Sequence, residues 1–208
     1  MAELTFFHGT MNCGKSTMAL QIHHNAVAAG KHCVLLTRND RAGGVISSRI
    51  GLTQPALVFD DTTDLYAELG GRIEGGAQVD VVICDEAQFT SPAQVEQLAD
   101  AVDVLGVEVQ AFGLLTDFTT RMFPGSRRLV ELADRCQQLP VDALCWCGRR
   151  GTHNARTVGG QMVTTGEQVV VGDVDGDTLA YEVLCRRHHR EGRTRNLAPV
   201  EPRVRLAG

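Results

Sequence analysis

Short apolar runs alternate with helical apolar patterns through the first 140 residues of the chain. This alternation is typical of parallel strands joined by right-handed helical crossovers. We expect strands at Leu4 to His8, Cys33 to Thr37, Ala56 to Phe59, Val79 to Cys84 and Val107 to Phe112. The run VDVVICDE is almost continuously apolar, which predicts a central strand that is covered on both faces.

Four segments between these strands have helical spacing, and one of them has a clear start signal. The expected helices are Ser16 to Ala29, Thr63 to Arg72, Pro92 to Leu105 and Ser126 to Cys136. Ser91 is a candidate N-cap, with Pro92 at the first helical position. The segment from Arg38 to Gly51 is polar, contains a Gly-Gly pair and is predicted to be a mobile loop.

The pattern changes after Pro140. Three cysteines, a group of histidines and short β-like runs follow, and these predict a small β subdomain. The runs are Gln161 to Thr164, Gln168 to Val171 and Leu179 to Leu184. We therefore expect a main domain over residues 1–140, the subdomain over residues 141–192, and a frayed tail over residues 193–208.

Composition narrows the class of protein. The chain has 208 residues, is 43% hydrophobic and lacks the run of about 20 apolar residues that a membrane span needs. Its seven cysteines fit reduced thiols in the cytoplasm better than a disulfide framework. The net charge is −5, although residues 145–208 carry ten arginines against seven acids. A nucleic-acid-binding tail would fit that excess, but a solvated basic stretch without interleaved aromatics is the favoured interpretation.

The segment GTMNCGKS, from Gly9 to Ser16, is a full match to the phosphate-binding loop G-x-x-x-x-G-K-[ST]. It lies between an expected strand and an expected helix, which argues against an ordinary glycine-rich turn. In such a loop the backbone N–H groups cradle phosphate, Lys15 reaches the β- and γ-phosphates, and Ser16 binds Mg²⁺. The fold class predicted is thus α/β, a P-loop NTPase-like parallel sheet flanked by helices.

Two acids, Asp85 and Glu86, end the expected central strand. Such a pair is often only a solvated strand edge, but after a P-loop it is a candidate for Mg²⁺ binding by Asp85. Adjacent strand residues point to opposite faces, which leaves Glu86 for another task.

Two short chelating pairs, C-x-C at Cys145 and Cys147 and C-x-x-H at Cys185 and His188, lie about 40 residues apart. Three thiolates and one imidazole form a closed tetrahedral set suited to structural zinc. Unpaired cysteines in a small β core are the competing interpretation, and His189 is an alternative ligand.

Together these motifs resemble the type II thymidine kinases, the zinc-containing class, closest to the bacterial members, from Ala2 to about His189. The similar segments are GTMNCGKST (9 to 17), DRAGGVISSRIGL (40 to 52), DEAQF (85 to 89), GLLTDF and FPGS (113 to 126), CWCG (145 to 148), GEQVVVG (166 to 172) and CRRHH (185 to 189).

The resemblance implies transfer of the γ-phosphoryl group of ATP to thymidine or deoxyuridine, with Glu86 as general base. It also implies feedback inhibition by thymidine triphosphate, a homotetramer, and no nucleic-acid or membrane partner. The implied ATP-binding positions are Gly9, Thr10, Met11, Asn12, Cys13, Gly14, Lys15, Ser16, Thr17, Asp85 and Gln88. The implied nucleoside-binding positions are Met11, Phe89, Leu114, Phe118, Phe123, Val171, Gly172 and Tyr181.

The chain departs from the family pattern between Val171 and Tyr181, where it is about four residues longer. Arg41 and Arg49 are further candidates for phosphate contacts. The rival hypothesis is a P-loop ATPase whose zinc module binds nucleic acid. The acidic main domain and the absence of a basic stripe with stacking aromatics count against that rival.

Overall fold

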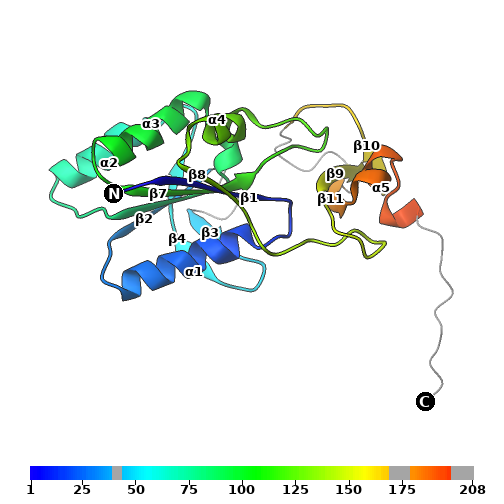
Figure 1. Cartoon of the computed structure of the whole chain (residues 1–208), viewed down its shortest axis with the longest axis horizontal. Coiled ribbons are helices and arrows are strands. Elements are labelled where there is room, and N and C mark those ends of the chain that lie inside the picture. Colours follow the sequence, from blue (N-terminus) through cyan, green and yellow to red (C-terminus); the bar gives the residue numbers. More distant parts are fainter. Residues whose placement is uncertain (39–43, 169–178, 198–208) are drawn as a thin grey trace, which may run out of the picture.

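The computed structural model describes residues 1–38, 44–168 and 179–197, arranged as two lobes that lie end to end (Figure 1). The larger lobe contains a six-stranded parallel sheet in the order β5-β2-β6-β7-β1-β8. Its strands are β1 (Leu4–Gly9), β2 (Cys33–Arg38), β5 (Leu57–Phe59), β6 (Val81–Asp85), β7 (Glu108–Leu114) and β8 (Arg135–Gln138). Five of the six were predicted, and all residues of β6 are buried, as a central strand requires.

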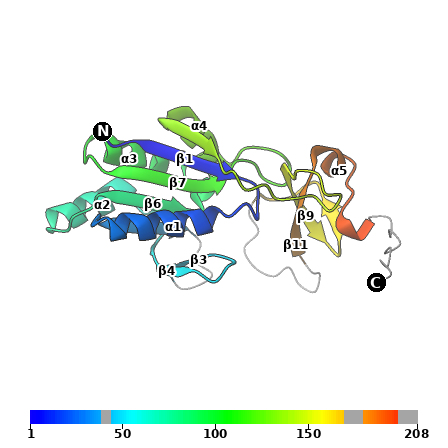
Figure 2. The same ribbon diagram turned by 60° about the horizontal axis from the view of Figure 1, so that its bottom comes forward.

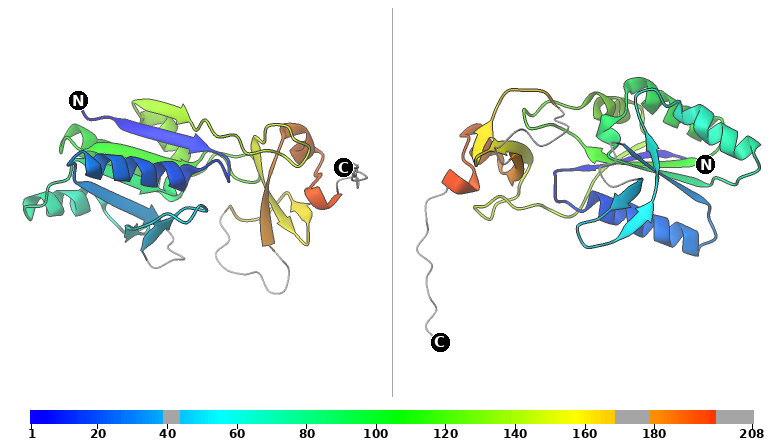
Figure 3. Two further views of the ribbon diagram at one scale, coloured as in Figure 1. Left: turned by 90° about the horizontal axis from the view of Figure 1, so that it is seen from below. Right: turned by 180° about the vertical axis from the view of Figure 1, so that it is seen from behind.

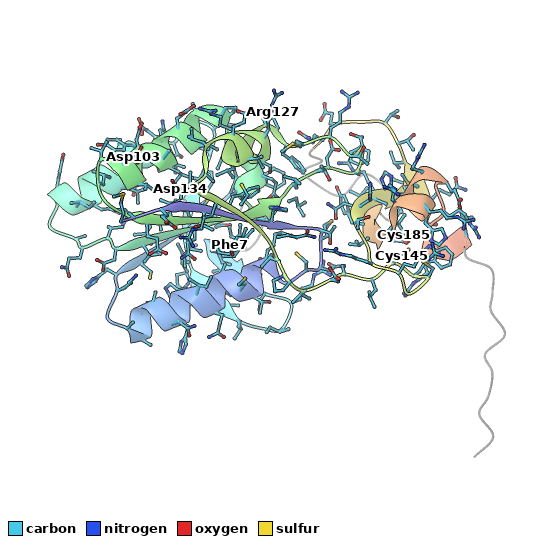
Figure 4. The ribbon with its side chains drawn as sticks, viewed as in Figure 1. Phe7, Asp103, Arg127, Asp134, Cys145 and Cys185 are labelled. Carbon is cyan, nitrogen blue, oxygen red and sulfur yellow. The ribbon has the colours of Figure 1, made fainter. Side chains whose placement is uncertain are left out.

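Helices cover both faces of this sheet, which confirms the predicted fold class (Figures 1 and 3). One face carries α1 (Lys15–Ala28), and the other carries α2 (Leu65–Glu74), α3 (Pro92–Asp103) and α4 (Pro124–Leu132). Each face has its own apolar core. On the α1 side Phe7 stacks on Phe112 with ring centroids 4.7 Å apart (Figure 4).

The start of α3 is fixed by side-chain hydrogen bonds at its first turn. The Ser91 hydroxyl accepts from the Gln94 backbone N–H, and the Gln94 amide oxygen accepts from the Ser91 backbone N–H. Pro92 occupies the first helical position, where its missing N–H costs nothing. The predicted N-cap is confirmed. This reciprocal pair satisfies two backbone donors that the helix itself leaves free.

The expected helix from Ser126 to Cys136 was wrong at its end. The helix α4 stops at Leu132, and β8 begins three residues later at the sheet edge beside β1. All four residues of β8 are exposed and polar or small, so no apolar pattern announced a strand. Backbone hydrogen bonds to a neighbouring strand decide this structure, and a sequence window does not contain them.

The segment expected to be a mobile loop also contains regular structure. Within its described part, β3 (Val45–Ser47) pairs antiparallel with β4 (Thr53–Pro55). Ile46 is buried in the core on the α1 side. Two apolar residues after a glycine pair were the available signal for this hairpin. Arg41 lies outside the described residues.

The smaller lobe has a three-stranded antiparallel sheet in the order β10-β9-β11. Its elements are β9 (His153–Val158), β10 (Gln161–Val163), β11 (Leu179–Leu184) and the short helix α5 (Arg186–Arg190). The runs at β10 and β11 were predicted, whereas β9 was missed. The expected run from Gln168 to Val171 is not a strand at Gln168, and its other residues lie outside the described ones.

The tail prediction was wrong for residues 193–197. The Trp146 indole donates to the Arg193 carbonyl, and the fully buried Thr194 donates its hydroxyl to the Gly160 carbonyl. A short 3₁₀ helix, η2 (Arg195–Leu197), follows. Residues 198–208 lie outside the described ones. In the described ranges, no helix has the length and apolarity needed to cross a bilayer.

Candidate active site

Residues at the carboxyl ends of the parallel strands and residues of the smaller lobe line a cavity of about 950 Å³. The arrowhead of β7 points toward the smaller lobe (Figure 2). The carboxyl ends of parallel strands are the usual place for ligands in such folds. Nearly all the described candidate residues lie around this cavity. Those of the phosphate and acid motifs are Met11, Asn12, Gly14, Lys15, Ser16, Thr17, Asp85, Glu86 and Gln88. Those of the implied nucleoside pocket are Met11, Phe89, Leu114, Phe118, Phe123 and Tyr181.

The glycine-rich segment makes a tight turn between β1 and α1. Asn12 and Gly14 have positive φ values of 65° and 81°, which bend the backbone sharply before the helix begins. At Gly9 a Cβ atom would overlap the Cys13 sulfur, so a side chain there would displace the turn. The Lys15 ammonium donates to the Thr10 carbonyl at 2.8 Å and so lies across the loop. Of the predicted ATP-binding set, Gly9, Thr10 and Cys13 shape this turn rather than line the cavity.

Asp85 ends β6 deep in the site, with 4% of its surface exposed. Burial, followed by the charge of Glu86, raises the pKa of this carboxyl from 3.8 to about 6, and a hydrogen bond with Ser16 opposes that rise. Ser16 begins α1, which follows β1, and Asp85 ends β6. Although β7 lies between these two strands, the two side chains meet at the carboxyl end of the sheet. The motif residues predicted to hold Mg²⁺ are therefore in contact.

Glu86 has a left-handed backbone with φ of 54°. This conformation is uncommon outside glycine. It persists only where the surrounding structure holds the residue in place, and it is enriched at active sites. Its carboxylate lines the cavity and accepts a hydrogen bond from the Gln88 amide. The Gln88 amide oxygen in turn accepts from the Leu114 backbone N–H at 3.0 Å, and Gln88 is 1% exposed. Gln88 thus orients Glu86, a role that the motif alone did not reveal.

Four aromatic residues that line the same cavity, Phe89, Phe118, Phe123 and Tyr181, form what we call the aromatic slot. Phe89 and Phe123 meet edge to face at 5.6 Å between ring centroids. Phe118 is almost fully buried, whereas Tyr181 is partly exposed. The two other predicted nucleoside-binding positions, Val171 and Gly172, lie outside the described residues. Arg49, a secondary candidate, also lines the cavity.

Sequence reasoning missed two polar residues at this cavity. Asn154 on β9 accepts from the Met11 backbone N–H at 2.8 Å and donates to the Thr116 carbonyl. Asp117 accepts from the side-chain amide of Gln168 at 2.9 Å. Both connect segments that lie far apart in the chain. No local pattern marked either residue, because their partners lie on segments that only the fold brings near.

The four predicted zinc ligands come together in the smaller lobe. The sulfurs of Cys145, Cys147 and Cys185 and a ring nitrogen of His188 all lie within 4.8 Å of one another. Figure 4 labels two of these residues, Cys145 and Cys185, in the smaller lobe. Cys145 Sγ is 3.4 Å from His188 Nδ1. Bond lengths of about 2.0 to 2.3 Å around tetrahedral zinc place neighbouring donors at about this separation. The cluster could hold a metal ion, and its donors fit zinc.

The contacts of His188 and His189 indicate which of the two histidines is the metal-ligand candidate. The Trp146 ring stacks on His188 with centroids 4.1 Å apart and holds the imidazole in place. The Nε2 atom of His189 lies 3.0 Å from the Phe118 carbonyl. His188 is therefore the ligand candidate that faces the cysteines, while His189 connects this lobe to the wall of the cavity.

Comparisons with known proteins agree with this site. The family model for thymidine kinase matches residues 2–189. The thymidine kinase of Streptomyces coelicolor is 59% identical over 93% of this chain and 91% of its own length. That of Cutibacterium acnes is 53% identical over 93% of this chain and 91% of its own. That of Jannaschia sp. is 44% identical over 92% of this chain and 96% of its own.

Among solved structures, Pif1 helicases on forked DNA overlap 66% of this chain with a TM-score of 0.40 at 16% identity, a likeness too weak to bear on function. The family match spans both lobes, including the cavity between them and the cysteine cluster. The chain therefore belongs to the thymidine kinase family.

Proposed function

We infer that this protein transfers the γ-phosphoryl group of ATP to the 5′-hydroxyl of thymidine or deoxyuridine. The observation that carries the inference is that one cavity is lined by the phosphate-binding loop, by the acids Asp85 and Glu86, and by a group of aromatic side chains. A phosphate donor fits the first and a flat nucleobase fits the last. Glu86 lines the same cavity and is assigned to the point where the acceptor hydroxyl would meet the γ-phosphate.

The loop and Asp85 are assigned to the donor. Backbone N–H groups and Lys15 bind the β- and γ-phosphates, and Thr17 and Gln88 complete the set of predicted positions. The Ser16 hydroxyl and Asp85 would hold Mg²⁺, whose charge neutralises the transferring group when it is bound. The contact between Ser16 and Asp85 supports this pairing.

Glu86 is assigned as the general base. It takes the proton of the 5′-hydroxyl as that oxygen bonds to the γ-phosphorus, and the bond to the bridging oxygen of ADP breaks. Gln88, itself held by the Leu114 backbone N–H, donates to this carboxylate and so fixes its orientation.

The aromatic slot and the loop through Val171 and Gly172 are assigned to the base. Thymine and uracil present an N3–H donor and an O4 acceptor, whereas cytosine presents the reverse at these edges. Fixed backbone groups that pair with thymine leave unsatisfied polar atoms against cytosine. Thymidine and deoxyuridine are therefore substrates, and deoxycytidine is a poor one.

The cysteine cluster is assigned to structural zinc, with no open position for a substrate. When bound, zinc would tie both ends of the smaller lobe together, because its four ligands come from two segments about 40 residues apart. The apolar core of this lobe is small and is built largely around the cysteines themselves. The lobe therefore depends on the ion more than the parallel sheet does.

Three further features belong to the same proposal. Thymidine triphosphate carries both a thymine and a phosphate chain and would act as a feedback inhibitor. The protein works in the cytoplasm, where thiol ligands stay reduced. It assembles as a homotetramer, an expectation that rests on the family resemblance.

A panel of acceptors tests the proposal. With ATP and Mg²⁺, ADP release is measured for thymidine, deoxyuridine, deoxycytidine and, separately, single-stranded DNA. We expect strong stimulation by the first two and little by the others. Stimulation by DNA alone would replace the kinase with the rival ATPase.

A further inference from the structure

One buried cation stands just behind the aromatic slot. Arg156 lies on β9 and is 3% exposed. It does not line the cavity itself, but four residues that it or its partners touch do: Phe118, Tyr181, Gln168 and Asp117. Burying a guanidinium is expensive unless its donors are satisfied. The groups that Arg156 contacts therefore indicate which part of the structure it stabilises.

Each nitrogen of the guanidinium has a hydrogen-bond partner. In the sequence, these partners lie before and after residues 169–178. Nη1 and Nη2 donate to the carbonyls of Glu167 and Gln168 at 2.8 and 3.1 Å. Nε donates to the Tyr181 hydroxyl at 3.2 Å. A single side chain thus binds both Glu167 and Gln168 and, on β11, Tyr181.

The same guanidinium also packs against two aromatic rings of the slot. Its central carbon lies 3.9 Å from the centroid of the Phe118 ring and 5.7 Å from that of Tyr181. A cation over an aromatic face is stabilising, and more so when both are shielded from water. Phe118 is also held from the backbone, since His189 lies against its carbonyl. Arg156 therefore fixes the inner wall of the slot as well.

A second connection strengthens the first end of the segment. The Gln168 side chain donates to Asp117, whose other oxygen accepts from the Thr119 and Arg121 backbone N–H groups. The carbonyl and the side chain of Gln168 are thus held from two sides. The root of the segment is fixed to the loop that carries Phe118.

We propose that Arg156 is a positioning residue that sets the nucleoside-binding surface by holding Phe118, Tyr181 and both ends of the 167–181 segment. Because both ends are held by one side chain, the position of Tyr181 does not depend on the residues between them. Tyr181 lines the cavity while its hydroxyl accepts from Arg156. The inference rests on the proposed nucleoside site and names what holds it together.

Lysine cannot replace this arrangement. Its ammonium is a compact charge without the planar fork, so it cannot reach two carbonyls and a phenol while lying flat on a ring. Arg156→Lys keeps the charge and most of the volume, which makes it the most informative variant. Arg156→Gln removes the charge as well.

The experiment compares wild type, Arg156→Lys and Arg156→Gln by calorimetric thymidine Kd, by thymidine and ATP KM, by kcat and by zinc content. Losing hydrogen bonds from a buried charged group predicts a thymidine Kd and KM raised about 10- to 100-fold. The ATP KM and the zinc content should stay at wild-type values. Arg150→Lys, an exposed arginine of the same lobe that pairs with Asp142, is the matched control and should behave as wild type.

One further variant separates positioning from general stability. Tyr181→Phe removes one acceptor and should raise the thymidine Kd by a smaller factor than Arg156→Lys does. An Arg156→Lys protein with full zinc content and unchanged thymidine Kd would overturn the inference. So would equal losses for thymidine and ATP, because they would indicate a general disturbance. A wild-type protein that does not bind thymidine would instead overturn the proposed function.

Discussion

At the scale of single residues, Glu86 carries the heaviest chemical assignment. Glu86→Gln should lower kcat by about two to four orders of magnitude, because an amide cannot accept the hydroxyl proton. ATP binding should change little, since the phosphate loop is untouched. Steady-state kinetics with an ATP-binding measurement check this, with the exposed Glu74→Gln as control. A variant that keeps half of the wild-type kcat would refute the assignment.

Asp85 provides a prediction on pH. The folded protein raises the pKa of this carboxyl from 3.8 to about 6, so the folded state binds its proton more tightly than the unfolded chain does. Stability contributed by the protonated form is therefore present below about pH 4 and is lost as pH rises to about 6. The free energy of unfolding of ligand-free wild type should fall over this window relative to Asp85→Asn. Denaturant titrations at several pH values measure the difference, and parallel curves would contradict it.

Residues whose task is set by local sequence could be predicted, and those set by distant contacts could not. The P-loop, the acid pair and the zinc ligands follow from spacing that any chain must keep for the same chemistry. Asn154 and Arg156 act through partners on segments that only the fold brings near. A polar residue in a short β run carries no sign of what it will meet.

At the scale of elements, the capping of α3 can be tested alone. Ser91→Ala removes the acceptor for the Gln94 backbone N–H and should destabilise the protein by about 1 kcal/mol. Ser91→Gly should cost only a few tenths, because glycine suits the cap position without a side chain. Urea unfolding midpoints of the two variants distinguish the cases. Equal midpoints for wild type and Ser91→Ala would show that the capping box does not stabilise the protein.

The elements that were predicted are those with strong apolar periodicity or a cap signal, such as β6 and α3. The missed ones draw their stability from pairing. The strand β8 is exposed along its whole length, and β9 holds buried polar residues whose hydrogen-bond partners lie on other segments. The division at residue 140 and the role of Val171 and Gly172 stay predictions.

At the scale of the whole molecule, the metal cluster and the nucleoside pocket belong to one lobe. Cys147→Ser should lose zinc and much of the thymidine affinity, while ATP binding in the parallel-sheet lobe persists. The reason is that β9 and β11 supply Asn154 and Tyr181 to the cavity, and zinc would hold their lobe together. Metal analysis and separate binding titrations for the two substrates check this. An exposed-cysteine change, Cys136→Ser, is the control.

A Cys147→Ser protein with a normal thymidine KM would break the link between the metal cluster and the nucleoside. Freshly purified wild type without zinc would break it earlier. If ATP and thymidine affinity fell together, the two lobes would have to unfold as one unit. The connection of Asn154 to the Met11 backbone is the place where such coupling would pass.

The central claim is that the cavity joins a phosphate donor to a nucleoside acceptor. Product analysis tests it most directly: purified protein, ATP, Mg²⁺ and thymidine are incubated, and ADP and thymidine monophosphate are quantified together. We expect equal amounts of both products, formed far more slowly by Glu86→Gln. ADP formed without thymidine monophosphate, or at a rate that thymidine does not change, would contradict it.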